Sequence, residues 1–494
     1  MTELLSFEKS RPNAQGPRLP DADVEAPALT DLLPRELLRA RPPELPRLSE
    51  PEIMRHYSRL ASMNYSISEQ FYPLGSCTMK YNPVVNEAAA AMPGFTDLHP
   101  YQGEETAQGA LSLMWRLEQA LCAVVGVDRV TLQPAAGAHG EWTALRMIQA
   151  FHRSRGEART EVLVPDSAHG TNPASAALSG FQVVEVKSGP DGRISLADLE
   201  GKLSPKVAAL MLTNPNTLGL FERQILDIAD IVHSTGAMLY YDGANLNAFM
   251  GICRPGDMGF DAVHMNLHKT FTTPHGGGGP GAGPVGVKAD LVPFLPTPTV
   301  ERMNGHLKLD FKRPLSIGRV RSFYGNFGML VRAYTYIVAM GGDGLTQASL
   351  DAVLSANYLR NEVDGALEMP HEGPCMHEFV ASARNLAPQG IKALDVAKGL
   401  LERDFYAPTI YFPLVVPEAI MVEPTETESK ATLDAFAAAI KDIVRQAKES
   451  PEALHEAPHG LPVGRLDEVA TARHINAYLQ GQSEDPILRW KPAP

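Results

Sequence analysis

The sequence has few cysteines, no long uninterrupted apolar stretch and no excess of positive charge. Its four cysteines, Cys77, Cys122, Cys253 and Cys375, are scattered without a CxxC pair, which argues against a disulfide framework or a zinc knuckle and favours a reducing cytosol. Apolar stretches are interrupted by Gly, Pro or charge well before the ~18 residues needed to cross a bilayer. The formal net charge of −13 at pH 7 argues against general binding of nucleic-acid phosphates. We expect a cytoplasmic protein that binds neither membranes nor nucleic acid.

The chain of 494 residues is long enough for two domains, because a single core usually stops growing at about 250–300 residues. From about Thr106 onward, apolar helical segments alternate with short apolar strands, which predicts an α/β fold with a mostly parallel sheet flanked by helices. Recurrent prolines nearer the N-terminus predict an extended arm, either free or wrapped over another surface. We expect an arm and a structured loop over residues 1–90, a large domain over residues 91–325 and a smaller C-terminal α/β domain over residues 326–494.

Lys269 and Asp242 are the strongest candidates for chemistry. Lys269, in VHMNLHKTF, follows an apolar strand, and burial there would lower the pKa of the amine and favour its reaction with an aldehyde. Asp242 ends the apolar strand AMLYYDGAN and should point into the crevice at the carboxyl edge of the sheet. Taken singly, each is more simply a surface lysine or a turn-capping acid. As an ordered pair they predict pyridoxal phosphate (PLP), which needs an amine for its aldehyde and an acid for its pyridine nitrogen.

Two further segments supply candidates for binding the cofactor. In PAAGAHGEW, Gly137 and Ala138 stand at a helix start, where backbone N–H groups could close on a phosphate. Such a turn is also common for purely steric reasons. In VPDSAHGTN, His169 follows another apolar strand and either stacks on the cofactor ring or is an ordinary loop histidine.

The segment LTNPNTLGLFE follows a further apolar strand and contributes Asn214, Asn216 and Thr217. Their polar groups are able to reach the phenolic oxygen of the cofactor. The alternative is an ordinary turn rich in asparagine and proline. The sequence alone leaves both interpretations open.

The histidines His264, His268 and His275 are spaced in a way that raises the question of a metal site. We expect no metal, because no HExxH motif is present and the first two histidines lie on a strand-like stretch. Residues i and i+4 of a strand share a face but lie ~13 Å apart. His268, beside Lys269, is better placed to reach the cofactor phosphate.

Several long motifs occur together and in order. They are FYPLGSCTMKYNP, QPAAGAHGE, DSAHGTNPASA, LTNPNTLGLFE, YYDGANLNA and HMNLHKTFTTPHGGGGPGAGPVGV, and they extend from about Phe71 to Val287. On these segments the chain resembles the P-protein family of the glycine cleavage system, the glycine dehydrogenases (decarboxylating). Weaker similarity continues toward the C-terminus.

This resemblance implies a fold and a set of roles for the candidate residues. The fold is fold type I of PLP enzymes, which is aspartate aminotransferase-like. Lys269 is implied as the Schiff-base lysine, Asp242 as the partner of the pyridine nitrogen and His169 as the residue stacked on the ring. Gly137 and Ala138 are implied near the phosphate.

The resemblance also implies a reaction and partners. Glycine loses its carboxylate as CO2, and the remaining aminomethyl group passes to the lipoyl arm of H-protein. A proline-rich arm followed by the lysine-bearing motifs resembles the second subunit of the two-subunit form. That form pairs this subunit with a homologous, lysine-free subunit 1, with two copies of each expected.

Alternatives remain at this stage. The same fold and cofactor serve aminotransferases, aldolases and other amino-acid decarboxylases, and a non-catalytic scaffold could keep the fold. Arg319 and Arg321, in SIGRVRSFYGN, are either contacts for a carboxylate or lipoyl arm, or ordinary surface arginines.

Overall fold

The computed structural model describes residues 3–276 and 280–472, with further gaps at 12–13, 15, 17–19, 22, 42–44, 462–463, 468 and 470–471. The chain divides into two compact units, Met1–Ser66 together with Gly460–Pro494, and Ile67–His459. All of the candidate site residues lie in the second unit. The boundaries at residues 90 and 325 stay predictions.

The first unit consists of short helices and irregular connections. Its helices are α1 Ser6–Lys9, α2 Leu29–Leu32 and α3 Glu50–Ser62, with a 3-10 turn at Arg35–Leu37. Ser49 caps α3 because its amide and hydroxyl both donate to the Glu52 carboxylate, at 2.9 and 2.8 Å. Several leucines of this unit are exposed, and whether the arm wraps another surface stays a prediction.

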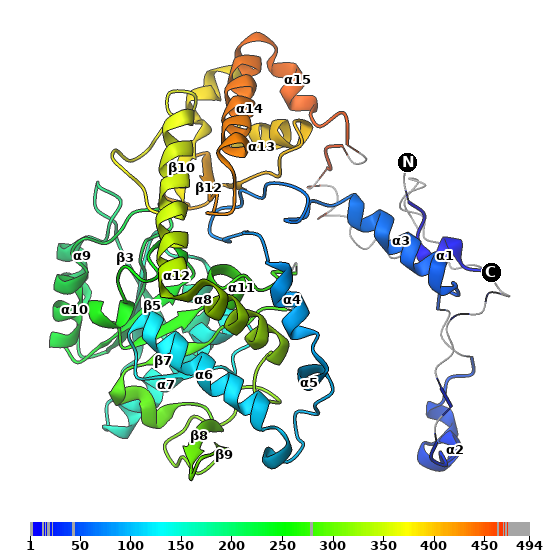
Figure 1. Cartoon of the computed structure of the whole chain (residues 1–494). Coiled ribbons are helices and arrows are strands. Elements are labelled where there is room, and N and C mark those ends of the chain that lie inside the picture. Colours follow the sequence, from blue (N-terminus) through cyan, green and yellow to red (C-terminus); the bar gives the residue numbers. More distant parts are fainter. Residues whose placement is uncertain are drawn as a thin grey trace. The chain divides into compact units, whose positions relative to one another are not determined.

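The second unit is organised around a seven-stranded sheet of order β1-β7-β6-β5-β4-β2-β3 (Figure 1). β7 runs antiparallel to its two neighbours, whereas the other neighbouring strands are parallel. The strands are β1 Arg129–Thr131, β2 Glu161–Pro165, β3 Gln182–Val186, β4 Val207–Thr213, β5 Met238–Gly243, β6 Ala262–Met265 and β7 Val285–Val287. The predicted α/β fold with a mostly parallel sheet is confirmed.

Helices cover this sheet because its central strands are apolar on both faces. Every residue of β4 and β5 is buried. Alternate residues of β5 belong to two different apolar cores, Leu239 and Tyr241 to one and Met238 and Tyr240 to the other. The helices of this region are α4 Val84–Ala90, α5 Pro93–Thr96, α6 Gln108–Val125, α7 Gly137–Ser154, α8 Thr171–Leu178, α9 Leu196–Lys202, α10 Ile225–Ser234 and α11 Leu267–Thr270.

The long helix α12 Phe327–Val363 connects this region to a smaller C-terminal part (Figure 1). Gly341, with φ 63°, interrupts its helical backbone. The C-terminal part has its own apolar core around an antiparallel sheet of order β10-β12-β11. Its elements are β10 Phe379–Ser382, α13 Ala393–Glu402, β11 Thr409–Ile410, β12 Ala419–Val422, α14 Lys430–Glu449 and α15 Pro451–Glu456. Before α12, the strands β8 Thr299–Met303 and β9 His306–Asp310 form a hairpin.

The loop of residues 71–81 packs against the small C-terminal sheet. Leu74 forms an antiparallel bridge with Val422 of β12. A Cβ at Gly75 would lie 2.2 Å from the side chain of Met421, so a glycine is required for this close approach. The structured loop expected from FYPLGSCTMKYNP therefore reaches a strand that lies far away in the sequence.

Neither a membrane-spanning helix nor a disulfide occurs in the described part of the chain. No helix there combines the length and the apolar character that a bilayer crossing requires. All four cysteines are free thiols in the structure.

Candidate active site

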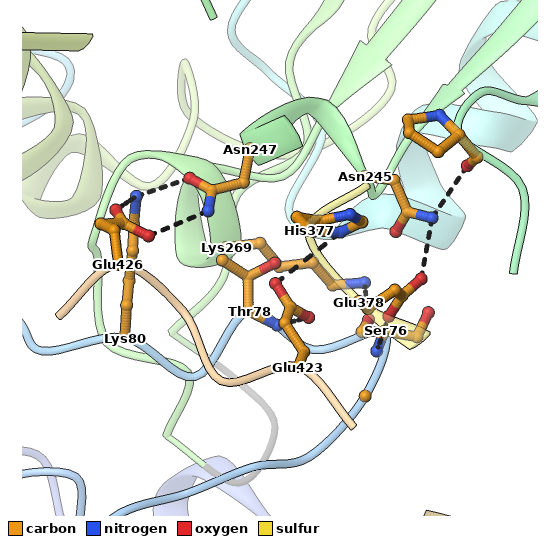
Figure 2. Close-up of polar contacts among 12 residues, drawn as sticks. Ser76, Thr78, Lys80, Asn245, Asn247, Lys269, His377, Glu378, Glu423 and Glu426 are labelled. Carbon is orange, nitrogen blue, oxygen red and sulfur yellow. Dashed lines mark hydrogen bonds and ion pairs between the residues drawn. The ribbon is translucent and has the colours of Figure 1, made fainter. Parts of the chain in front are cut away.

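The end of β6 and the short helix after it determine the position of Lys269. Asn266 is the N-cap of α11, so the chain turns from strand to helix at the carboxyl edge of the sheet. Lys269 is half-buried, and its Nζ donates a hydrogen bond of 2.7 Å to the carbonyl oxygen of Ser76 (Figure 2). The amine therefore faces the loop of residues 71–81.

Asp242 lies on the neighbouring strand at the same edge. It pairs with His264 in the parallel register of β5 and β6. Its side chain is buried, and its Oδ1 accepts a hydrogen bond of 3.0 Å from the amide of Ala244. A buried carboxylate is costly without a partner, which suits this group to binding a cation or an N–H donor.

His264, on the neighbouring strand β6, lies next to Asp242. Burial lowers the pKa of His264 and raises the pKa of Tyr240 well above its usual value, so the ring is neutral and the phenol keeps its proton. The Tyr240 hydroxyl lies 2.6 Å from His264 Nδ1, and His264 Nε2 lies 3.5 Å from Asp242 Oδ1. A phenol that donates to Nδ1 leaves the ring proton on Nε2, the atom that faces Asp242 and also lies 3.3 Å from the side-chain nitrogen of Asn266.

The N-terminus of α7 comes close to the same residues. Gly137 is the first residue of this helix, and a Cβ there would lie 2.6 Å from Asn266 Oδ1 and 3.4 Å from His264 Nε2. Ala138 follows it and is exposed. The first turn of an 18-residue helix thus opens beside the Lys269 segment, with N–H groups that are available to an anion.

His169 lies in the loop between β2 and α8. Its side chain is exposed, its Nδ1 is 2.9 Å from Thr171 Oγ1, and its ring meets Phe412 edge-on at 5.7 Å. Desolvation by the surrounding protein, and then the charge of Lys269, lower the pKa of His169, while Asp242 raises it. The imidazole is therefore a neutral ring near the amine and the acid.

Glu141 was not singled out in the sequence, although it ends the motif QPAAGAHGE. It is buried on α7, and its two oxygens accept hydrogen bonds from Thr171 Oγ1 at 2.8 Å and Ser175 Oγ at 2.7 Å. Burial, and then the charge of Asp242, raise the pKa of Glu141 to about 7. Through Thr171, this carboxyl group orders the loop that presents His169.

The three polar residues after β4 have different surroundings. The Asn216 side chain donates to Gly192 O at 2.8 Å and accepts from two backbone amides, so it serves the turn. Asn214 Oδ1 accepts from the amide of Glu222, whereas its Nδ2 is buried without a partner. Thr217 Oγ1 donates to Ser167 O at 2.5 Å, which links this turn to the loop before His169.

His268 and His275 lie next to each other after β6, with ring centroids 5.1 Å apart. Burial, and then His275 and Lys269, lower the pKa of His268 to about 3. The expectation that His264 and His268 share one strand is wrong, because β6 ends at Met265 and His268 lies on α11. The strand-spacing argument against zinc therefore does not apply.

Three buried residues of the C-terminal part were missed in the sequence (Figure 2). His377 and Glu378 precede β10, Glu423 follows β12, and all three side chains are buried. The charge of Lys269 acts on each of them. The sequence offered one signal for these residues, namely an ionisable residue directly next to a short apolar strand. Such a residue usually marks only the end of the strand.

The carboxylates of Glu378 and Glu423 bind the loop of residues 71–81. In this loop the carbonyl oxygen of Ser76 accepts the hydrogen bond from Lys269. Glu378 Oε2 accepts from the amide of Ser76 at 2.7 Å, and Glu423 Oε2 accepts from the amide of Thr78 at 2.8 Å. Ser76 and Thr78 have φ values of 65° and 46°, a left-handed conformation that residues with a Cβ rarely adopt. The loop therefore depends on the C-terminal part for its strained shape.

The residues fit a pyridoxal phosphate group. The charges of Lys269 and Asp242 both act on His169, and a Cβ at Gly137 would fill space beside Asn266 and His264 of the same strand-to-helix segment as Lys269. Within the described residues, four buried polar atoms of the segment that carries Lys269 have no hydrogen-bond partner, namely Asn266 Oδ1, Thr270 Oγ1, Thr273 Oγ1 and His275 Nε2. Such atoms are rare unless a ligand or water satisfies them.

A separate cavity of about 530 Å³ lies next to α12 and is lined in part by Arg321, Tyr324 and Asn326. Lys269 and Asp242 do not line it. Arg321 donates to Asn326 Oδ1 at 2.8 Å, while Arg319 is exposed and lies over the Phe311 ring at 5.3 Å. Neither arginine has a contact that assigns it a ligand.

Comparison with known proteins identifies the family. The model of the glycine cleavage system P-protein matches residues 23–304, and that of the glycine dehydrogenase C-terminal domain matches residues 348–459. A protein of Caldanaerobacter subterraneus subsp. tengcongensis, named "Probable glycine dehydrogenase (decarboxylating) subunit 2", is 57% identical over 98% of each chain.

Solved structures share the fold. A crystal structure of glycine decarboxylase (P-protein) in inhibitor-bound form superposes with a TM-score of 0.72 at 22% identity, covering 85% of this chain and 95% of that chain. A C-DES mutant with glycine covalently linked to its PLP cofactor superposes with a TM-score of 0.58 at 15% identity, covering 76% and 97%. The predicted fold type I is confirmed, and the chain belongs to the glycine cleavage system P-protein family, the PLP-dependent glycine dehydrogenases (decarboxylating).

Proposed function

We propose that Lys269, Asp242 and His169 carry the PLP-dependent decarboxylation of glycine in this chain. The observation that supports this proposal best is the position of Lys269 and Asp242 at one carboxyl edge of the sheet, where both act on His169. This edge is where α/β sheets usually bind ligands.

In this proposal each side chain has a defined task. Lys269 Nζ would hold the cofactor through its aldehyde group, and the hydrogen bond to Ser76 O positions this amine. Asp242, whose Oδ1 lies 3.5 Å from His264 Nε2, would bind the protonated pyridine nitrogen. With that proton in place, the bound cofactor supplies an electron sink for the electron pair left when CO2 departs. His169 covers the ring as a neutral imidazole.

Other residues bind the polar groups of the cofactor. Gly137 and Ala138 offer the N–H groups of the first turn of α7 to the phosphate, with His268 close to the lysine segment. Asn214 and Thr217 are assigned to the phenolic oxygen. The buried Nδ2 of Asn214, which has no hydrogen-bond partner among the described residues, supports this assignment, whereas the Thr217 hydroxyl also donates to Ser167 O. Asn216 is not assigned to the cofactor, because its side chain forms hydrogen bonds within the turn.

The relatives' name, "subunit 2", supports a partner. We propose that the chain works in the cytosol with a homologous, lysine-free subunit 1, two copies of each, and that the aminomethyl group of glycine passes to the lipoyl arm of H-protein. The match to that subunit 2 relative covers 98% of this chain and 98% of the relative.

Glycine-dependent exchange of labelled bicarbonate tests this function. We expect exchange when the chain is co-expressed with subunit 1, and a strong increase on adding lipoylated H-protein. Alanine or glutamate in place of glycine should give no exchange, which separates this reaction from those of other PLP decarboxylases. Glycine-independent amino transfer without exchange would contradict the proposal.

Gly137→Val should weaken cofactor retention. The new side chain would enter the space beside Asn266 Oδ1, which a Cβ at this position already approaches to 2.6 Å. We expect the dissociation constant of PLP to rise about tenfold or more, since each 1.4 kcal/mol is a factor of ten. Spectroscopic titration of the apo-protein measures it.

Gly109→Val is the matched control for this substitution. Gly109 also lies in the first turn of a long helix, α6, but nothing is within 4 Å of a Cβ there. Cofactor affinity should stay unchanged. If both variants retain PLP equally well, the phosphate binds elsewhere.

A further inference from the structure

Glu378 and Glu423 form a carboxyl pair next to the loop that faces Lys269 (Figure 2). Ser76 connects them directly, because its carbonyl accepts from Lys269 Nζ while its amide donates to Glu378. Both carboxyl groups are fully buried. The charged and titratable groups around the pair are His377 before β10, Lys269 on α11, Cys77 in the loop and Glu426, which is paired to Lys80, after β12.

The two carboxyl groups differ in their hydrogen bonds. Both oxygens of Glu378 accept N–H donors, from the Ser76 amide at 2.7 Å and Asn245 Nδ2 at 3.1 Å. Among the described residues, Glu423 Oε2 accepts from the Thr78 amide, whereas Oε1 is buried with no hydrogen-bond partner and lies 3.7 Å from His377 Nε2. Glu378 is therefore bonded as a carboxylate, whereas Glu423 Oε1 has room for a proton.

The charges of the site agree with one proton on this pair. Burial raises the pKa of Glu423 to about 7, and burial together with the charge of Glu423 raises the pKa of Glu378. Two buried carboxylates beside a single lysine ammonium would leave one negative charge uncompensated. A proton on one of them removes that charge.

We propose that Glu423 is a proton-exchange residue for Lys269. Its carboxylate takes a proton from the Lys269 ammonium before the amine bonds to the cofactor aldehyde, and it returns the proton when the amine is released. One proton moves between Lys269 Nζ and Glu423 Oε1, and no electrons are gained or lost. Glu378 is a positioning residue, because it holds Ser76 and keeps a negative charge beside Glu423.

The same cluster has donor atoms for a cation, since His377, Glu378 and Glu423 each offer one ligand atom within 4.8 Å. We assign a proton instead for two reasons. A divalent cation would lie near the Lys269 ammonium and be repelled by it. The oxygens of Glu378 are also already occupied by N–H donors.

The test follows the attachment of PLP to the full-length apo-protein by absorbance, from about pH 6 to about pH 9, around the pH where an exchange group must be poised. In the unchanged chain, the rate should rise through pH 7, because Glu423 accepts a proton only once it is ionised. In Glu423→Gln, the rate at neutral pH should fall about 100-fold. The rise in rate through pH 7 should also be lost in this variant.

Glu378→Gln provides a second variant with a different signature. Removing the neighbouring negative charge makes Glu423 easier to ionise, so the rise in rate should move to lower pH. The matched control is Glu222→Gln, because Glu222 is a buried carboxyl whose pKa burial likewise raises to about 7, without Lys269 among the groups that act on it. Its pH profile should match that of the unchanged chain.

Three outcomes would overturn this inference. One is a lower rate in Glu423→Gln at every pH with the same profile, since loss of the loop's support alone would do that. Another is a profile that moves equally in Glu222→Gln. The third is stoichiometric zinc that is lost only in Glu423→Gln. The inference rests on the proposed role of Lys269; an attachment band that survives Lys269→Ala refutes that role, whereas an unchanged Glu423→Gln profile refutes only the exchange.

Discussion

Lys269→Ala is expected to reduce glycine-dependent bicarbonate exchange to background. The substitution removes the amine that bonds to the cofactor aldehyde, and no other lysine occupies that position in the described structure. The absorbance band of lysine-bound PLP should be absent from the purified variant. The fold should survive, because the lost hydrogen bond to Ser76 contributes only about 1 kcal/mol. Absorbance, exchange and thermal unfolding together measure these effects.

Lys288→Ala is a matched control for this experiment. Lys288 is also half-buried, and its Nζ also donates to a backbone carbonyl, that of Gly126 at 2.7 Å. It directly follows β7, which runs antiparallel to β6, so it lies at the opposite edge of the sheet from Lys269. Exchange should be retained in this variant. Normal turnover in Lys269→Ala would refute the proposed site.

Asp242→Ala should leave PLP bound through Lys269 but slow decarboxylation on the order of 10²-fold or more. Without this carboxylate, the proton on the pyridine nitrogen is no longer stabilised, and the ring is a weaker electron sink. Asp242→Asn should behave similarly, because an amide keeps the shape of the side chain but not its charge. The absorbance band and the rate of single-turnover CO2 release measure the two parts separately.

Asp261→Asn controls for damage to the sheet. Asp261 Oδ2 accepts from the amide of Leu239, at the other end of the same strand β5, at 2.7 Å. We expect a loss of stability similar to that in Asp242→Asn, with unchanged turnover. Equal kinetic losses in the two variants would show that Asp242 matters only for folding.

The sequence was sufficient to predict the large α/β region and the position of Lys269 and Asp242 at one edge of its sheet. Its strands are apolar on both faces and its helices have a local period, so neither depends on distant contacts. Lys269 and Asp242 each follow an apolar strand, and the carboxyl ends of neighbouring parallel strands meet at one edge. Local order along the chain was therefore enough to bring them together.

The short helix α11 was missed for a local reason. The residues around Asn266 continue the apolar pattern of β6, with Met265 before it and Leu267 after it, so the segment resembles a longer strand. Asparagine is a preferred N-cap, and here it precedes a single helical turn. Periodicity over so few residues does not separate the two structures.

The C-terminal carboxylates were missed because their position depends on tertiary packing. Glu378 and Glu423 are separated from Ser76 and Thr78 by 302 and 345 residues, and nothing local indicates that they meet. A glutamate next to a short strand usually faces solvent. Only the packing of the small sheet on the loop of residues 71–81 buries them.

The contact between that loop and β12 also limits which substitutions in the two segments are compatible with each other. The loop lies within the segment that matches one family model, and β12 within the segment that matches the other, so this contact joins two stretches with separate sequence signatures. A side chain at position 75 would clash with Met421, so we expect evolution to retain glycine there. Chimeras that join the first part of one homologue to the last part of another should therefore be most active when both parents have the same residues at the contact between the loop of residues 71–81 and β12.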